Sequence, residues 1–236
     1  MTWEKLSSEL KFSDLAFKDR PLLFRNVIKN PETFLSWKNI EECFDDPQNY
    51  GFEVIDRETG KKHHIPKTPS PINGRPVPTK EFLTDSLNNG HSMAIRGGYS
   101  THNSIMNSFA AEIEEMFNMA TQIDIYLSGK TSRSFPIHED TSTNFICQMF
   151  GNTRWKVFKN RCSDLLRLKE YPFKEDELDV CLDEVLTPGD VLYIPSRNFH
   201  VAIPTERRLS LSIVCLPQHY PHRAQRIDRT KLQFKK

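Results

Sequence analysis

The stretch LTPGDVLYIPSRNFHVAIP, from Leu186 to Pro204, combines two strand-like runs with two turns. PGD is typical of a tight turn, VLYIP of a strand, and SRNFH of a return that leads the chain into HVAIP. The second run begins with the one histidine of the stretch, His200. A turn that leads a strand to a histidine is one way for a β-barrel to direct an imidazole at its own opening. We therefore expect His200 at the mouth of a barrel.

Runs of the same kind recur through the second half of the chain. They are rich in β-branched and aromatic residues and are bounded by Gly, Pro, Asn or Ser. They are QIDIYLSG from residue 122, NFICQMFG from 144, RWKVFK from 154, VLYIP from 191, HVAIP from 200 and RLSLSIVCL from 208. This density of short runs predicts an antiparallel β-sandwich or barrel. The acidic segment 174–184 is expected to be a solvated connection between strands.

The first half of the chain has a helical character instead. Thr79 and Gly90 are suited to the start and the end of one helix. A second helix is expected within 103–120, where apolar residues recur at three- and four-residue spacing and acids fill the other face. The apolar residues are Ile105, Phe109, Ile113, Met116, Phe117 and Ala120. YGFEVID, residues 50–56, is expected to be a strand.

We divide the chain accordingly into three parts. Residues 1–120 would be an α/β extension whose helices pack outside the barrel, 121–218 the mostly β core, and 219–236 a basic tail. The tail has six Lys or Arg residues against one Asp. It is a candidate for weak binding to an acidic partner or RNA, with a disordered basic tail as the alternative.

Composition limits the class of protein. The chain has 236 residues, of which 37% are hydrophobic and 27% charged, as in a soluble globular protein. A net charge of +1 provides no overall field for nucleic acid or anionic membranes. No apolar run approaches the ~20 residues that span a bilayer, and the first residues lack a signal-peptide core. The five cysteines are widely spaced and odd in number, which favours the reducing cytoplasm.

A second polar stretch, SFPIHEDTSTNF from Ser134 to Phe145, contains His138 and Asp140. On a strand these two residues point to the same face, while Glu139 points away and is expected to matter little. With His200 they would present two imidazoles and one carboxylate to a metal, the facial triad of non-haem Fe(II) oxygenases. Alone, His-x-Asp is consistent with ordinary surface and His200 with a core histidine, so the assignment depends on the combination. The remaining histidines are assigned no chemistry.

Four pieces between Gln122 and Cys215 form a specific series. They are IDIYLS, PIHEDTSTNFICQMFGNTRWKVF, LTPGDVLYIPSRNFH and LSLSI. The series resembles the JmjC and cupin-like Fe(II)/2-oxoglutarate oxygenases, especially the branch of the ribosomal oxygenases and of the asparaginyl hydroxylase that modifies hypoxia-inducible factor. A plainer cupin has His-x-His where this chain has Asp140, which favours the oxygenase form.

The resemblance implies a fold, a set of ligands and a reaction. The fold would be a double-stranded β-helix, a cupin-like jelly-roll with the N-terminal helices packed outside. His138, Asp140 and His200 would hold Fe(II), with 2-oxoglutarate as chelating cosubstrate and O2 at the remaining position. The chain would then be a 2-oxoglutarate-dependent dioxygenase, a hydroxylase that forms succinate and carbon dioxide as it oxidises its substrate.

One feature departs from the family pattern. These enzymes often anchor the distal carboxylate of 2-oxoglutarate with a Lys or Arg two residues after the turn glycine. Gly151 places Thr153 at that position, and a hydroxyl donates a hydrogen bond without supplying charge. Arg208 is the preferred substitute, because other branches of the superfamily use an Arg-x-Ser pair at a comparable place and Ser210 completes that pair. The alternative for Arg208 is an exposed strand position.

Other residues are candidates for the cosubstrate site. Arg154 and Lys156 are rival cations, but strand alternation turns them away from the face of Thr153 unless the strand bulges. Tyr126 and Asn144 match positions at which relatives hydrogen-bond the cosubstrate. The alternative for Tyr126 is packing inside the barrel, and for Asn144 a place in a turn.

Substrate and partners are less constrained. The expected substrate is a protein or peptide side chain, and a small metabolite or natural-product intermediate is the alternative within the same chemistry. A third hypothesis is a non-catalytic cupin-like module that binds a metal or ligand, which the uncharged Thr153 favours. No membrane partner is expected.

Overall fold

The computed structural model of the chain describes residues 20–97, 102–117, 119–129, 134–161 and 175–216. The helices among them are α3 (Trp37–Asp45), α4 (Lys80–Asn88), α6 (Ser104–Phe117) and the short 3-10 helices η1 (Pro31–Thr33), η2 (Pro47–Asn49) and η3 (Glu175–Glu177). The strands are β1 (Leu22–Phe24), β2 (Gly51–Ile55), β3 (Thr68–Pro69), β4 (Pro76–Val77), β5 (Ser92–Arg96), β6 (Ala120–Ser128), β7 (Thr143–Phe150), β8 (Thr153–Arg161), β9 (Val180–Leu186), β10 (Val191–Ile194), β11 (Asn198–Pro204) and β12 (Arg208–Leu216). No helix among the described residues has the length and apolar character that crossing a membrane requires.

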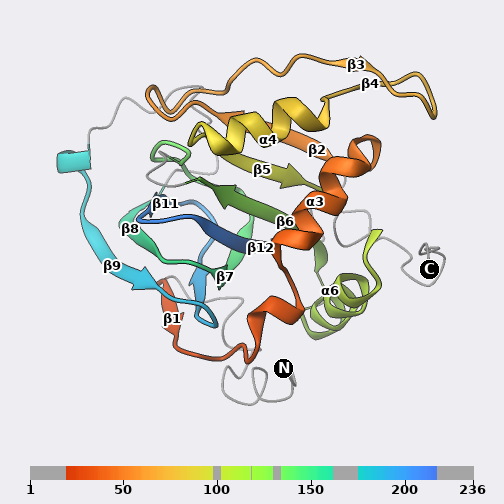
Figure 1. Cartoon of the computed structure of the whole chain (residues 1–236). Helices are drawn as coiled ribbons and strands as arrows, with labels where there is room; N and C mark the ends of the chain where they lie inside the picture. Colours follow the sequence, from red (N-terminus) through yellow and green to blue (C-terminus); the bar gives the residue numbers. More distant parts are fainter. Residues whose placement is uncertain (1–19, 98–101, 118, 130–133, 162–174, 217–236) are drawn as a thin grey trace.

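Two antiparallel sheets form the centre of the molecule. The larger has seven strands in the order β1-β10-β7-β12-β6-β5-β2, and the smaller has the order β11-β8-β9. Figure 1 shows α3, α4 and α6 on one side of the larger sheet and β8, β9 and β11 on the other. The fold is therefore mostly β with helices packed outside, which confirms the predicted double-stranded β-helix.

The larger sheet has one apolar and one polar face where it passes the site. On β12, Leu209, Leu211 and Ile213 are buried in the core shared with the helices. Residues of opposite parity point to the other side, because side chains alternate along a strand. These are Arg208, Ser210 and Ser212. The strand thus carries polar groups into the space between the two sheets.

A second core closes much of that space. Its members come from both sheets and are almost fully buried, so they hold the sheets together by removing apolar surface from water. They are Ile146, Trp155, Val157, Leu186, Leu192, Ile194 and Ala202. The polar site lies beside this cluster and is supported by it.

The N-terminal segment does more than cover the barrel. Its strands β1, β2 and β5 extend the larger sheet, and β5 pairs with β6 from Ser92↔Ser128 to Ile95↔Ile125. The strand expected at 50–56 is confirmed as β2, whereas β5 was not predicted. Thr79 Oγ1 accepts a hydrogen bond from Phe82 N at 3.3 Å, so α4 begins at the predicted cap.

Helix α6 differs in detail from its prediction. Asn103 Oδ1 accepts a hydrogen bond from Met106 N at 3.1 Å, and the helix ends at Phe117 because Ala120 already belongs to β6. Ile105, predicted on the buried face, is 54% exposed, while Met106 is fully buried. The buried stripe is therefore rotated by one residue at the start of the helix.

The expectation for the acidic segment 174–184 is wrong in part. Its second half belongs to β9, which pairs with β8. Asp183 accepts two hydrogen bonds from Arg154 on β8, at 2.6 and 2.7 Å. Opposite charges across neighbouring strands favour pairing, so exposed acids are compatible with an edge strand here.

Candidate active site

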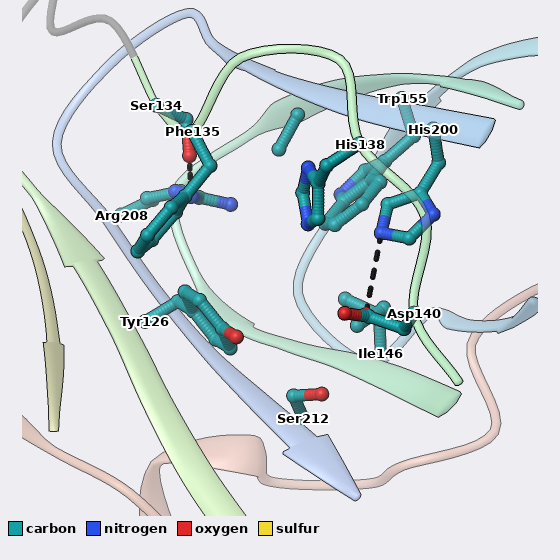
Figure 2. Close-up of a pocket in the computed structure, with 11 residues that line it drawn as sticks. Tyr126, Ser134, Phe135, His138, Asp140, Ile146, Trp155, His200, Arg208 and Ser212 are labelled. Atoms are coloured by element: carbon teal, nitrogen blue, oxygen red, sulfur yellow. Dashed lines mark hydrogen bonds and ion pairs between the residues drawn. The ribbon is translucent and has the colours of Figure 1, made fainter. Parts of the chain in front are cut away.

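Backbone pairing brings the three predicted ligands together. His138 N donates to His200 O at 3.2 Å and His200 N to His138 O at 2.9 Å, while Arg197 N donates to Asp140 O at 2.7 Å. One potential ligand atom from each of His138, Asp140 and His200 lies within 4.8 Å of the other two. Figure 2 shows the three side chains gathered at one side of a pocket.

Both imidazoles are oriented by carbonyl groups. His138 Nδ1 lies 2.7 Å from Pro136 O, and His200 Nδ1 lies 2.9 Å from Asn198 O. A carbonyl oxygen only accepts, so each Nδ1 carries the proton and each Nε2 retains its lone pair. Carbonyl contacts of this type fix the tautomer of metal-binding histidines. The Nε2 of His200 is 3.5 Å from Asp140 Oδ2.

The protonation states suit cation binding. Burial, reinforced by the neighbouring His138, lowers the pKa of His200 to about 4, so its ring is neutral at pH 7. Burial by itself raises the pKa of Asp140, but His200, His138, Arg96 and a hydrogen bond from Asn144 bring it below its usual range. Two imidazoles, of which the His200 ring is neutral, and one carboxylate on one side of a site fit Fe(II) and related divalent ions.

The cluster opens into a small pocket between the two sheets. Besides the cluster itself, its walls combine four apolar residues with four that carry a hydroxyl group or a charge. The lining residues, with the cluster included, are Tyr126, Ser134, Phe135, His138, Asp140, Ile146, Trp155, His200, Ala202, Arg208 and Ser212. A small polar ligand in contact with a metal at the cluster would be largely surrounded by protein.

Arg208 lies across the pocket from Asp140 (Figure 2). Its side chain is almost completely buried, and its Nη2 donates to Ser134 Oγ at 3.0 Å. Its Nε and Nη1 have no hydrogen-bond partner among the residues that the structure describes. Burial lowers the pKa of Arg208 to about 10, which still leaves the guanidinium charged at pH 7. A buried charge with unused donors is suited to an anionic ligand.

The rival cations lie elsewhere. Arg154 is bonded to Asp183 on the exposed face of the smaller sheet, and Lys156 Nζ is 2.5 Å from Glu175 Oε1. Neither lines the pocket. The expected alternation along β8 therefore holds, and Arg208 is the one of the three proposed cations that lines the pocket with the three predicted ligands.

The remaining predicted residues divide into two groups. Tyr126 lines the pocket, whereas Thr153 and Ser210 are buried outside its lining. Ser210 Oγ donates to Gln148 Oε1 at 2.9 Å, and Thr153 Oγ1 has no partner in the described part of the chain. Asn144 lies on β7, not in a turn, and its Nδ2 donates to Asp140 Oδ2 at 2.6 Å. Asn144 thus orients the carboxylate, and the cosubstrate roles stay predictions.

Arg96, which was assigned no role among the predicted site residues, joins the N-terminal strands to the pocket through Tyr126. Its guanidinium donates to Tyr126 OH at 2.5 Å, to Asp124 Oδ2 at 2.9 Å and to Glu53 Oε2 at 2.9 Å. It also lies over the ring of Phe135, at 5.5 Å from the centroid. A single arginine at the end of the apolar run SMAIR was the available signal. Its partners become visible only once β5 pairs with β6.

Glu139 is the second residue whose importance the sequence did not indicate. It lies outside the three-residue cluster, as predicted, although residues 138–140 do not form the strand on which that prediction rested. Its Oε1, however, is 2.8 Å from Arg197 Nη1, and the two side chains are only 5% and 4% exposed. Arg197 adopts a left-handed backbone, with φ of 71°, and its amide supports Asp140. The expectation that Glu139 matters little is therefore replaced.

Replacing Glu139 by alanine is expected to destabilise the fold by about 3–5 kcal/mol, because it breaks a buried ion pair. It should also weaken metal binding, since the same turn holds Asp140. Denaturant unfolding and Co2+ titration measure the two effects. Glu184→Ala is the control, because Glu184 pairs with Arg25 where both are about half exposed; it should cost less than about 1 kcal/mol. Equal stability of the two variants would contradict the prediction.

The fold and site thus define a β-helix barrel with two histidines and an aspartate beside a buried cation. Residues 100–223 match the JmjC domain family. This match covers more than half of the chain, so the chain belongs to the JmjC domain family.

Curated relatives support this assignment. The bifunctional lysine-specific demethylase and histidyl-hydroxylase NO66 of Drosophila simulans is 32% identical over 104 residues, which are 43% of this chain and 12% of that protein. Human ribosomal oxygenase 1 is 34% identical over 97 residues, which are 40% of this chain and 15% of that protein. The matches therefore cover less than a sixth of these relatives.

Solved structures support the fold. YcfD, a ribosomal oxygenase from Escherichia coli solved with cobalt and 2-oxoglutarate, has a TM-score of 0.61 and 17% identity, covering 94% of this chain and 53% of that chain. Another YcfD structure has a TM-score of 0.62 at 18% identity, covering 94% and 54%. This chain spans about half the length of YcfD.

Proposed function

We propose that this chain is an Fe(II)- and 2-oxoglutarate-dependent oxygenase that hydroxylates a side chain of a protein or peptide. The observation that carries the proposal is the pairing of two features in one pocket. His138, Asp140 and His200 converge on one side, and the buried guanidinium of Arg208 faces them. A metal site and an anion site in the same pocket suit a metal-chelating dicarboxylate.

The residues present fit both groups. Nε2 of His138 and of His200 and the carboxylate of Asp140 would hold Fe(II). Arg208 would bind the distal carboxylate of 2-oxoglutarate through its unused donors, with Ser134 fixing the guanidinium. When bound, iron and 2-oxoglutarate supply the activation of dioxygen and the oxidation of a substrate C–H bond. The apolar wall around Trp155 would exclude water from the reacting atoms.

Asn144 and Arg96 would position other groups. Asn144 holds one oxygen of Asp140 by its amide, and Ser142 Oγ in turn donates to Asn144 Oδ1 at 3.1 Å. Arg96 donates to the hydroxyl of Tyr126, so that hydroxyl can direct its own proton into the pocket. These contacts keep the ligands in place before substrate binds.

A protein substrate is supported by the relatives. Their names describe histidyl hydroxylation, lysine demethylation and ribosomal oxygenation, all of which concern macromolecular targets. The same chemistry on a small metabolite is the alternative. We also propose a cytoplasmic location, which the widely spaced and odd-numbered cysteines support. The basic tail 219–236 lies outside the described residues, and its binding to RNA or an acidic partner stays a prediction.

Succinate formation tests the proposal. The purified chain is incubated with Fe(II), ascorbate and 2-oxoglutarate under air, and succinate is measured with and without peptides from ribosomal proteins. We expect slow succinate formation that requires Fe(II) and increases with a peptide that gains one oxygen atom by mass spectrometry. Absence of both succinate and 2-oxoglutarate binding would contradict the proposal and favour a non-catalytic binding module. If only small metabolites, and no peptide, increase succinate formation, the substrate would be a small metabolite and not a protein side chain.

A further inference from the structure

A second group of metal-ligating side chains lies away from the pocket, at the end of β2 and β5 opposite to Arg96. Asp56 follows β2, His63 lies in the segment after it, and His91 precedes β5. One potential ligand atom of each lies within 4.8 Å of the others. We propose that Asp56, His63 and His91 form a second site, for a divalent transition-metal ion of the zinc class. This site is independent of the proposed oxygenase activity.

A tight turn brings His63 back to Asp56. Asp56 N donates to Lys61 O at 2.9 Å, and Gly60 N donates to Asp56 O at 2.9 Å. Beyond the turn, His63 N donates to Val54 O at 2.7 Å. The chain therefore runs back along β2, and backbone hydrogen bonds fix where the imidazole starts.

The end of α4 positions the second imidazole. Gly90 has φ of 83°, and His91 N donates to Ser86 O at 3.0 Å. Arg57 N donates to His91 Nδ1 at 3.1 Å, so this nitrogen carries a lone pair. The same Nδ1 lies 3.8 Å from Asp56 Oδ2. His91 Nδ1 is thus the proposed ligand atom. On metal binding it would give up its hydrogen bond from the Arg57 amide and bind the ion instead.

The other two ligands each have one suitable atom left. Asp56 Oδ1 accepts from Glu58 N, Thr59 N and Thr59 Oγ1 at 3.0, 2.8 and 2.9 Å, which leaves Oδ2 on the side of His91. His63 Nδ1 lies 2.7 Å from His64 O and must donate to it. Its Nε2 therefore carries the lone pair, as in a metal-bound histidine whose other nitrogen is held by a carbonyl.

The separations and the donor types indicate the class of ion. Ligands held at about 2.0–2.2 Å around a tetrahedral ion lie roughly 3.3–3.5 Å apart, so the 3.8 Å between His91 Nδ1 and Asp56 Oδ2 requires only a small closure. Two imidazoles and one carboxylate favour zinc and its neighbours over magnesium or calcium. His63 is exposed, and Asp56 and His91 are 26% and 16% exposed, so an ion can enter from solvent and retain water.

Nearby cations do not occupy the ligand atoms. Lys62 Nζ is 2.5 Å from Glu53 Oε1, and Arg57 Nη1 donates to Asn89 O at 3.0 Å. A bound ion would join the end of β2, the returning segment and the junction of α4 with β5. We therefore assign it a structural role in the N-terminal half of the molecule.

Cobalt titration of the complete chain tests the site. The chain is first treated with a chelator, and Co2+ binding is then followed by calorimetry and visible absorption. We expect two equivalents for the natural chain and one each for His63→Gln and His138→Ala, because each variant disables one of the two clusters. The double variant should bind none. His64→Gln is the matched control, since the neighbouring His64 contributes only its backbone carbonyl, and it should still bind two.

Two outcomes would overturn the proposal. One is equal Co2+ stoichiometry for His63→Gln and the natural chain, and the other is no binding by His138→Ala. A thermal readout adds independent evidence, because Zn2+ should raise the unfolding midpoint of His138→Ala but not that of the double variant. Loss of the second site alone would leave the proposed oxygenase function unaffected, and a chain without succinate formation could still bind this second ion.

Discussion

Replacing Asp140 by alanine is expected to abolish Fe(II) binding at the candidate active site and to lower succinate formation by more than ~100-fold. Loss of a group that only supports a metal ligand already lowers metal affinity or activity by about 10–100-fold, and loss of a ligand itself should have a larger effect. Asp140 is the single carboxylate of the cluster, and 38% of its side chain is exposed toward the pocket. Without it, two imidazoles would have to hold a divalent cation with no negative charge to balance it. Calorimetry with Fe(II) under anaerobic conditions measures the binding, and succinate release measures the turnover.

The fold should survive this change, because the pocket lies beside the apolar core and Asp140 belongs to no strand. Asp183→Ala is the matched control, because it makes the same Asp-to-Ala change on β9, where Asp183 pairs with Arg154 on the exposed face. Its Fe(II) affinity and turnover should equal those of the natural chain. A folded Asp140→Ala chain that retains turnover would refute the metal assignment.

Replacing Arg208 by methionine is expected to raise the KM for 2-oxoglutarate by about 100-fold, at roughly tenfold for each charge-assisted hydrogen bond removed. The guanidinium has two nitrogens without a partner among the described residues, which a ligand carboxylate would satisfy. Methionine fills a similar volume without charge. Steady-state kinetics at varied 2-oxoglutarate, with Fe(II) saturating, measures the change.

In Arg208→Met, the stability of the fold and the affinity for 2-oxoglutarate should change in different ways. A buried, incompletely paired charge opposes folding, so Arg208→Met should keep or raise the unfolding midpoint while cosubstrate binding is lost. Arg154→Met is the control, because this exposed arginine is bound to Asp183 and should leave the KM unchanged. An increase in KM with Arg154→Met and none with Arg208→Met would return the anchoring role to β8.

Local pattern was sufficient for most of the barrel. The β-branched and aromatic runs of β6, β7 and β12 and the PGD turn before β10 indicated the strands, because residue preference and turn chemistry depend on adjacent residues. The same logic failed for β9, whose acids resemble a loop until Arg154 of the neighbouring strand compensates Asp183. It also missed β5, whose short apolar run lies within the helical half of the chain.

The candidate site was likewise predictable only in part. His-x-Asp and the histidine after the PGD strand were recognisable in the sequence, since their spacing matches a known series. Which cation faces them was not, because Arg208, Arg154 and Lys156 all lie on strands and differ only in the side of the sheet to which they point.

The sequence by itself therefore determined most of the strand pattern, the double-stranded β-helix and the three residues expected to hold a metal. The tertiary structure decided that Arg208 is buried in the pocket, that Glu139 pairs with Arg197, and that Asp56 meets His63 and His91. The physical reason is that turns and alternation arise from neighbouring residues along the chain. The environment of a charge depends on strand register and packing, which bring together residues far apart in sequence.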